Sequence, residues 1–208
     1  VTLALLSALK RRGLRIHAAK SGPDYIDPAF HARATGEESI NLDSWSMPPG
    51  LLDNLMEQAS ADADIVVVEG VMGLFDGIAG VAGRTGATAD LAARFGLPVV
   101  LVIDVSAQAQ SAAALLRGFA THDPAVQIAG VILNRVAGER HGRLVSRAIE
   151  DLRIPILGML PRDDAVTLVL PRLLDDDGTA DELVLTVRSI DHRVPGTVEV
   201  RRRTAVAS

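Results

Sequence analysis

Two carboxylates on a glycine-rich turn are the residues whose type and spacing most directly suggest chemistry in this sequence. Glu69 ends the apolar run 66–68, and Asp76 follows it on a turn that contains several glycines. Glycine lets the backbone adopt positive φ or approach a bound group closely. Carboxylate oxygens are ligands of Mg²⁺, which usually shares them with phosphate groups. The turn is therefore a candidate site for a hard cation, although a buried strand followed by an ordinary polar loop has the same pattern.

A lysine and two further carboxylates follow an earlier apolar run. Lys20, Asp24 and Asp27 come directly after a predicted strand at 14–19. Asp24 and Asp27 are three residues apart, so one helical turn would place both on the same side. Asp27 also precedes Pro28, which is the pattern of a helix N-cap followed by proline at the first helical position. That local role accounts for Asp27 without chemistry, whereas Asp24 has no such local explanation.

Short apolar runs alternate with amphipathic segments along the chain and must position these loops. The predicted strands are 14–19, 64–69, 98–104, 127–133 and 155–160, and the predicted helices are 1–12, 29–35, 51–59, 88–95, 106–119 and 139–152. Strands that are apolar throughout are typical of parallel sheets buried on both faces. The sequence therefore predicts an α/β fold in which a mostly parallel sheet carries helices on both faces. Because ligands bind at the carboxyl ends of such strands, we predict Glu69 and Asp24 close together there, with Lys20 facing them.

The remaining segments give weaker signals. Residues 41–45 are expected to form a loop with the only tryptophan, and the glycine-rich stretch 80–86 is either a flexible connection or a lid over a large substrate. Ser106 is interpreted as a helix cap. Beyond 166 the pattern weakens, with a solvated turn at 175–178 and a strand-like alternation at 183–187. Five histidines lack a metal-ligand spacing and are interpreted as surface or loop residues: His17, His31, His122, His141 and His192.

Composition excludes several classes of function. The chain has 208 residues, enough for one α/β domain with a sizeable core, and only 3% are aromatic, so that core must be aliphatic. A net charge of −5 argues against nucleic acid as the main partner. The absence of cysteine excludes disulfides, a thiolate nucleophile and a cysteine zinc site. No apolar run of about 18 residues and no signal peptide are found, so we expect a cytoplasmic protein without a membrane partner.

Four motifs together resemble the cobyrinic/hydrogenobyrinic acid a,c-diamide synthases, within the dethiobiotin synthetase-like group of P-loop NTPase folds. They are Lys20-Ser-Gly-Pro-Asp-Tyr-Ile-Asp27, Asn41-Leu-Asp-Ser-Trp45, Val68-Glu-Gly-Val-Met-Gly-Leu-Phe-Asp-Gly77 and Gly130-Val-Ile-Leu-Asn-Arg135. The resemblance covers residues 1–163. It implies a ligase of cobalamin biosynthesis, a glutamine amidotransferase that amidates the a and c acetate groups of a corrin-ring substrate. In this family ATP converts each carboxylate to an acyl phosphate, and ammonia from glutamine displaces the phosphate.

The resemblance also implies roles for particular residues. It implies Mg²⁺ ligands at Glu69 and Asp24, and catalytic roles for Asp24, Asp76 and Lys20 toward Mg²⁺–ATP and the reacting carboxylate. The residues implied at the corrin substrate are Tyr25, Ile26 and Asp27, and those implied at the nucleotide are Asn134 and Arg135.

Two parts of the family pattern are missing from the sequence: the phosphate loop before the first helix, and the glutaminase domain with its cysteine nucleophile. We therefore expect residues 1–165 to be a synthetase domain without its phosphate loop, residues 166–208 to be a divergent segment, and the chain to fold but be inactive alone. Three alternatives stay open: a dethiobiotin synthetase-like ligase, a partition-type or regulatory P-loop ATPase, and an inactive remnant. The loop 25–27 and the turn 74–76 argue against the first, and the negative charge argues against the second. The oligomeric state, a homodimer included, and the presence of cobalt in the substrate also stay open.

Overall fold

The computed structural model describes residues 1–162, 185–188 and 197–200. The chain divides into two compact units, Val1–Leu97 and Pro98–Ser208. The predicted boundary at 165/166 stays a prediction, because most of 166–208 lies outside the described residues. The solvated turn at 175–178 and His192 also lie outside them. No helix in the described part of the chain is long and apolar enough to cross a membrane.

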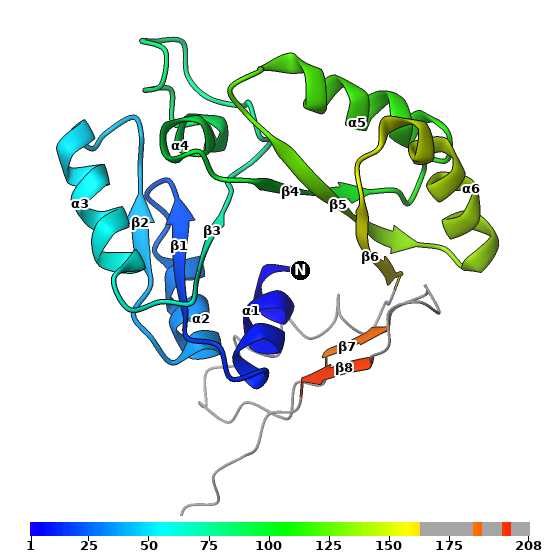
Figure 1. Ribbon diagram of the computed structural model, residues 1–208, viewed down its shortest axis with the longest axis horizontal. Coiled ribbons are helices and arrows are strands. Elements are labelled where there is room, and N and C mark those ends of the chain that lie inside the picture. Colours follow the sequence, from blue (N-terminus) through cyan, green and yellow to red (C-terminus); the bar gives the residue numbers. More distant parts are fainter. Residues whose placement is uncertain (163–184, 189–196, 201–208) are drawn as a thin grey trace, which may run out of the picture. The chain divides into compact units, whose positions relative to one another are not determined.

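The first unit is built on three parallel strands in the order β2-β1-β3 (Figure 1). Its elements are α1 (Thr2–Arg11), β1 (Ile16–Ser21), α2 (Ile26–Thr35), β2 (Ile40–Leu42), α3 (Pro49–Ser60), β3 (Ile65–Glu69) and α4 (Thr88–Phe95). Strands β1 and β3 run in register, so that Lys20 lies opposite Glu69. The two residues that the sequence placed at strand ends are therefore neighbours across the sheet.

Helices cover both faces of this sheet, because side chains alternate between its faces along each strand. On one face, Ile16 and Ala18 of β1 pack with Leu6 of α1 and the partly buried Ala34 of α2. On the other, Ala19 and Leu42 pack with Leu52 of α3 and Leu91 of α4. Figure 1 shows α1 and α3 on opposite sides of the strands. The predicted arrangement, parallel strands with helices on both faces, is confirmed in this unit.

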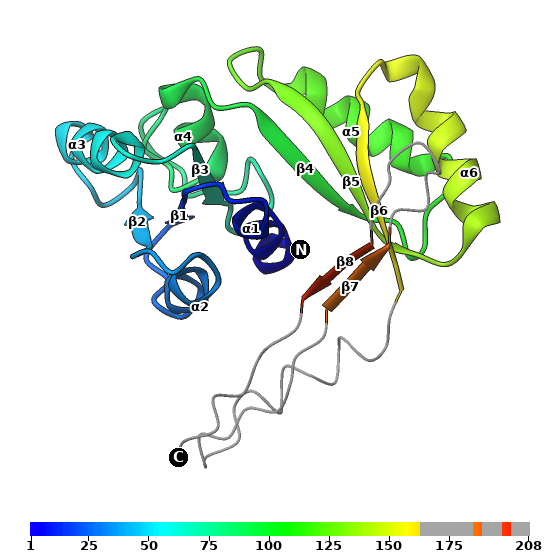
Figure 2. The same ribbon diagram turned by 60° about the horizontal axis from the view of Figure 1, so that its bottom comes forward.

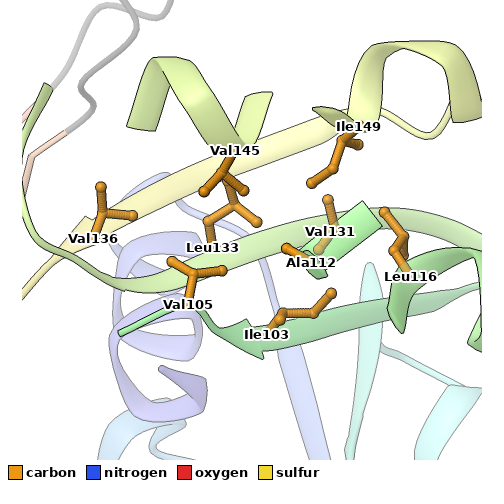
Figure 3. Packing of buried hydrophobic residues seen from close by; sticks show 9 residues of the cluster. All are labelled: Ile103, Val105, Ala112, Leu116, Val131, Leu133, Val136, Val145 and Ile149. Carbon is orange, nitrogen blue, oxygen red and sulfur yellow. The ribbon is translucent and has the colours of Figure 1, made fainter. Parts of the chain in front are cut away.

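The second unit has its own parallel sheet in the order β4-β5-β6. Its elements are β4 (Val99–Asp104), α5 (Ser111–His122), β5 (Ile128–Val136), α6 (Glu139–Ile149), the short 3-10 helix η1 (Glu150–Leu152) and β6 (Ile156–Pro161). Helices α5 and α6 lie on one face of the strands (Figure 2), and an aliphatic core fills the space between them (Figure 3). Strands β7 (Leu185–Arg188) and β8 (Thr197–Val200) form an antiparallel pair.

The elements differ from the predicted ones mainly at their ends. Strand β1 extends to Ser21, so Lys20 belongs to the strand and not to the loop after it. Helix α2 begins at Ile26, three residues earlier than predicted, because the Asp24 carboxylate accepts a hydrogen bond from the Ile26 N–H at 2.8 Å and supports the first turn. Asp27 is therefore inside the helix, and its interpretation as the N-cap is wrong.

Three further predictions are corrected. Residues 41 and 42 belong to the short strand β2, not to a loop. Helix α5 begins at Ser111, so Ser106 is not its cap; the Ser106 N–H instead donates to the Asp104 carboxylate at 2.9 Å. Strand β5 continues to Val136, and β8 was not predicted at all.

Candidate functional site

The candidate site begins with a charged pair at the carboxyl ends of β1 and β3. Lys20 points to the same face of the sheet as Ile16 and Ala18, since alternate residues of a strand share a face. Glu69 lies opposite it in register. The Lys20 Nζ lies 3.5 Å from the Glu69 Oε2 and donates to the Gly70 carbonyl at 3.1 Å. Only 6% of Lys20 is exposed, so this ammonium group is buried among its partners.

Helix α2 covers this face and contributes two more polar residues. Asp27 and His31 are four residues apart, so they lie on the same side of the helix. The Asp27 Oδ2 is 2.6 Å from the Lys20 Nζ, and the His31 Nε2 is 2.7 Å from the Glu69 Oε2. Lys20, Asp27, His31 and Glu69 are called the sheet-edge cluster below.

His31 is held at both ring nitrogens. Its Nδ1 lies 3.3 Å from the Ser39 Oγ, and this hydroxyl donates its hydrogen to the Ala18 carbonyl at 2.9 Å. The Glu69 carboxylate only accepts hydrogen bonds, so the His31 Nε2 donates to it, while Nδ1 contacts the Ser39 hydroxyl.

The cluster favours the charged forms of Glu69 and Lys20. Burial alone would raise the pKa of Glu69, but the Thr2 hydroxyl, the Lys20 ammonium and His31 outweigh burial and lower it. Burial alone would likewise lower the pKa of Lys20, but Asp27 and Glu69 raise it. The cluster thus keeps a lysine cation and a carboxylate anion side by side at the edge of the sheet.

Asp24 and Asp27 have exchanged the roles that the sequence suggested. The Asp24 carboxylate supports the start of α2, and its backbone carbonyl accepts from the Asn41 Nδ2 at 2.6 Å. Asp27, which was given the local role, faces Lys20. The prediction that Asp24 has no local explanation is therefore wrong. Tyr25 and Ile26 are exposed at the start of α2, Tyr25 to 83%.

Asp76 holds its own turn together. Its Oδ2 accepts from the Gly73 N–H at 3.0 Å, and a Cβ on Gly73 would come within 2.5 Å of the same oxygen. A Cβ on Gly70 would lie 2.9 Å from the Thr88 Oγ1, which accepts the Val71 N–H. Gly70 and Gly73 are thus required because a side chain at either position would collide with a neighbouring residue of the turn or of α4.

In the second unit, Asn134 and Arg135 lie near the end of β5. Arg135 adopts φ 60, an uncommon conformation for a non-glycine residue, and its Nη1 lies 3.2 Å from the Asp104 Oδ2. The Asn134 carbonyl accepts from the Val105 N–H at 3.0 Å, which joins the ends of β4 and β5. The Asp104 carboxyl has a lowered pKa, because the Ser106 N–H and hydroxyl and the Arg135 guanidinium stabilise its charge.

His31 is the site residue that sequence reasoning missed, and its interpretation as a surface or loop residue is wrong. Only 1% of it is exposed, and it lies inside α2. Its four-residue spacing from Asp27 was the available signal. Ser39 had no such signal, because its role depends on the chain returning beside β1. His17 lies in β1 and His141 in α6, where His141 bonds the Gln108 carbonyl at 2.6 Å.

A magnesium ion would need help from other oxygens at this edge. Among the described residues there is no group of three or more His, Cys, Asp or Glu side chains that could hold a metal ion. Mg²⁺ is usually bound by one or two carboxylates together with substrate phosphates and water, so such a group is not required. His31 and Lys20 both lie at the Glu69 Oε2, and the Thr2 hydroxyl also hydrogen-bonds this carboxylate. With phosphate and water oxygens supplying the other ligands, the donor set fits a cation at Glu69.

The fold and the matched sequence together define a class of protein. Residues 1–170 match the family described as the CobQ/CobB/MinD/ParA nucleotide binding domain, and the chain belongs to this family. The fold is similar to FtsY from the chloroplast of Physcomitrella patens, with a TM-score of 0.58 at 20% identity over 78% of this chain and 55% of that one. FtsY from Elizabethkingia anophelis gives a TM-score of 0.54 at 16% identity, over 78% of this chain and 53% of that one. The predicted P-loop NTPase fold is confirmed.

The sequence relatives are more specific. The chain is 55% identical over 168 residues to the hydrogenobyrinate a,c-diamide synthase of Mesorhizobium japonicum, covering 81% of this chain and 38% of that protein. It is 50% identical over 171 residues to the Agrobacterium fabrum enzyme of the same name, covering 82% and 39%. The Rhodobacter capsulatus enzyme is 53% identical over 170 residues, covering 81% and 39%. The resemblance seen in the motifs is confirmed, and the chain spans well under half the length of these relatives.

Proposed function

We propose that this chain is the ATP-dependent synthetase part of a hydrogenobyrinate or cobyrinate a,c-diamide synthase of cobalamin biosynthesis. The observation that carries the proposal is the 55% identity over 168 residues to a hydrogenobyrinate a,c-diamide synthase. The family match over residues 1–170 includes the residues of the sheet-edge cluster. Because this chain contains no cysteine, we assign release of ammonia from glutamine to the part of the relatives that it does not span.

The proposed reaction converts an acetate carboxylate to an amide in two steps. ATP supplies the phosphoryl group of an acyl phosphate, with Mg²⁺ offsetting its charge. Ammonia then forms the new C–N bond as the acyl C–O bond to phosphate breaks. Both steps place negative charge next to the reacting carbon, so a fixed positive charge there lowers the barrier.

Lys20 is the residue that we propose to supply that charge. Its raised pKa keeps the ammonium protonated, and its burial means that little water weakens its field. Asp27 is the more exposed of its two partners, with 40% of its side chain accessible against 25% for Glu69. We therefore propose that Asp27 is the partner that turns toward the substrate, while Glu69 stays and binds Mg²⁺ with Asp24.

The remaining proposed roles follow from exposure. Tyr25 and Ile26 present apolar surface to solvent at the start of α2, which suits contact with a macrocyclic substrate. Asp76 is exposed on the turn after Glu69, and we propose that it acts on the substrate side. In the second unit, Asn134 and Arg135 are proposed to contact the nucleotide.

Thermal unfolding of the chain with and without ligands tests the proposal. With Mg²⁺–ATP present, hydrogenobyrinic or cobyrinic acid at about 100 times its dissociation constant should raise the melting temperature by roughly 5–10 °C. The a,c-diamide product should raise it less, since it lacks the reacting carboxylates. Glu69→Gln should abolish the Mg²⁺-dependent part of the shift, whereas Glu57→Gln, on the exposed side of α3, should not.

Two results would contradict the proposal. One is a shift with the diamine substrate of a dethiobiotin synthetase and none with a corrin acid. The other is a shift with duplex DNA and Mg²⁺–ATP alone, which would favour a partition-type ATPase.

A further inference from the structure

We propose that His31 is a positioning residue, which holds the Glu69 carboxylate by its Oε2 in the one orientation in which this carboxylate receives a hard cation. Only the cation rests on the proposed function. The orientation of Glu69 is a property of this chain alone.

The first support is the contact itself. The His31 Nε2 lies 2.7 Å from the Glu69 Oε2, a short distance for an N–H···O hydrogen bond to a carboxylate. His31 is 1% exposed, so water does not compete for this bond. A carboxylate with one oxygen held this way has little freedom to rotate.

The second support is that the ring is itself anchored. The His31 Nδ1 lies 3.3 Å from the Ser39 hydroxyl, which donates to the Ala18 carbonyl of β1. Ala18 pairs with Val67 of β3, two residues before Glu69. The chain of hydrogen bonds thus starts and ends on the same pair of strands, so the imidazole is fixed relative to the carboxylate that it holds.

The third support is that Lys20 contacts Asp27 more closely than Glu69, so it does not fix the orientation of the Glu69 carboxylate. Its Nζ is 3.5 Å from the Glu69 Oε2 but 2.6 Å from the Asp27 Oδ2. The Thr2 hydroxyl also hydrogen-bonds Glu69, but it is a neutral donor, so without His31 the Lys20 ammonium would draw the carboxylate toward itself. A ligand oriented by a hydrogen-bonded neighbour binds metal more tightly, and loss of that neighbour typically costs 10–100-fold in metal affinity.

Crystal structures and Mn²⁺ binding of a small set of variants test the proposal, with Mn²⁺ as the spectroscopic probe for Mg²⁺. His31→Leu removes the hydrogen bond at similar volume, and His31→Gln retains a donor where Nε2 lies. Thr35→Val is the matched control, because it removes a buried hydroxyl from the same helix that bonds only the His31 and Glu37 backbone. Glu69→Gln identifies the Mn²⁺ signal that belongs to this site.

In the crystal structure of His31→Leu we expect the Glu69 carboxylate to rotate toward Lys20, and in electron paramagnetic resonance titrations we expect Mn²⁺ affinity to fall at least tenfold. His31→Gln should recover affinity to within about threefold of the unsubstituted chain, and Thr35→Val should leave it unchanged. If His31 serves only the stability of the fold, His31→Leu should behave like Thr35→Val: stability falls, but the Glu69 carboxylate does not move.

An unmoved Glu69 carboxylate in His31→Leu would overturn the proposal, whatever the affinities. If His31→Leu does not fold, Ser39→Ala is the deciding variant, because it removes the hydroxyl that anchors the His31 ring. Glu69 should then occupy more than one orientation. A single unchanged orientation would overturn the proposal. If the unsubstituted chain binds no Mn²⁺, the metal site of the proposed function fails, while the orientation of Glu69 in the variants still decides the role of His31.

Discussion

At the scale of single residues, the sheet-edge cluster balances buried charge. Lys20 and Glu69 lie at strand ends, and α2 adds Asp27 and His31, so two carboxylates face one ammonium and one imidazole. Burying charge is costly unless each charge is paired and hydrogen-bonded. Removing one member should therefore destabilise the protein more than removing an exposed charge.

Lys20→Met should lower the free energy of unfolding by about 2–3 kcal/mol, because it leaves two carboxylates without their cation in a half-buried site. Arg143→Met, which breaks an exposed pair with Glu139 on α6, should cost less than about 0.5 kcal/mol. Urea denaturation at pH 7 measures both. Equal effects of the two substitutions would show that burial of Lys20 carries no energetic weight.

Asp104 offers a pH prediction in the second unit. Its folded pKa is lowered, chiefly by the Ser106 N–H and hydroxyl and then by Arg135, so its contribution to stability is present above the unfolded pKa and lost as pH falls through the folded pKa. Arg135→Gln should move the carboxyl titration to higher pH, since it removes one cause of the shift. Carbon-13 NMR of the Asp104 carboxyl measures this, and a midpoint that does not move would exclude the ion pair in solution.

At the scale of elements, the loop after β3 is shaped by contacts at its base. The Ile78 N–H donates to the Thr85 carbonyl at 2.8 Å, and the Asp90 Oδ2 accepts from the Thr85 N–H at 2.6 Å and from the Ser44 hydroxyl at 2.8 Å. These bonds join the two ends of the loop to each other and to the start of α4. Whether the stretch between them acts as a lid stays a prediction.

Gly77→Ala should open the base of this loop. A Cβ at 77 would lie 2.7 Å from the Thr85 backbone carbonyl, which cannot move without breaking the bond to Ile78. We expect a loss of about 1–3 kcal/mol in the free energy of unfolding. Gly80→Ala is the control, because its Cβ would meet its nearest neighbour only at 3.8 Å. Equal stability of the two variants in thermal unfolding would contradict the close contact at 77.

At the scale of the whole molecule, each unit has an aliphatic core of its own. The core of the second unit lies between its sheet and helices α5 and α6, and the first unit has one core on each face of its sheet. With only 3% aromatic residues, these cores depend on close packing of valine, leucine, isoleucine and alanine. Truncation of a single buried leucine should therefore lower the free energy of unfolding substantially.

Two neighbouring leucines of α5 test the second core. Leu116 is fully buried, whereas Leu115 is 40% exposed. Leu116→Ala should cost about 2–5 kcal/mol through lost burial and a cavity, and Leu115→Ala less than about 1 kcal/mol. Urea denaturation gives the magnitudes, and hydrogen exchange should show faster exchange in 98–162 for Leu116→Ala. Similar losses for both leucines would contradict the packing of α5.

The sequence by itself determined the class of fold, because apolar runs of β-branched residues alternating with helical segments leave few other solutions. It also determined that Glu69 and Lys20 lie at the carboxyl edge, since Glu69 ends one apolar run and Lys20 directly follows another. The motif combination determined the family. These features are local, so they can be read from neighbouring residues.

Only the tertiary structure decided which acids and which histidine meet at that edge. The choice between Asp24 and Asp27 depended on where α2 begins, and that start is set by one side-chain hydrogen bond to Ile26. Helix α2 shows almost no amphipathic pattern, so its sequence did not reveal which side faces the sheet. His31 contacts Glu69 directly across 38 residues of chain, and Ser39 links the other side of the ring to the Ala18 carbonyl of β1. Such contacts form between distant segments, so their existence is settled by packing and not by any local pattern.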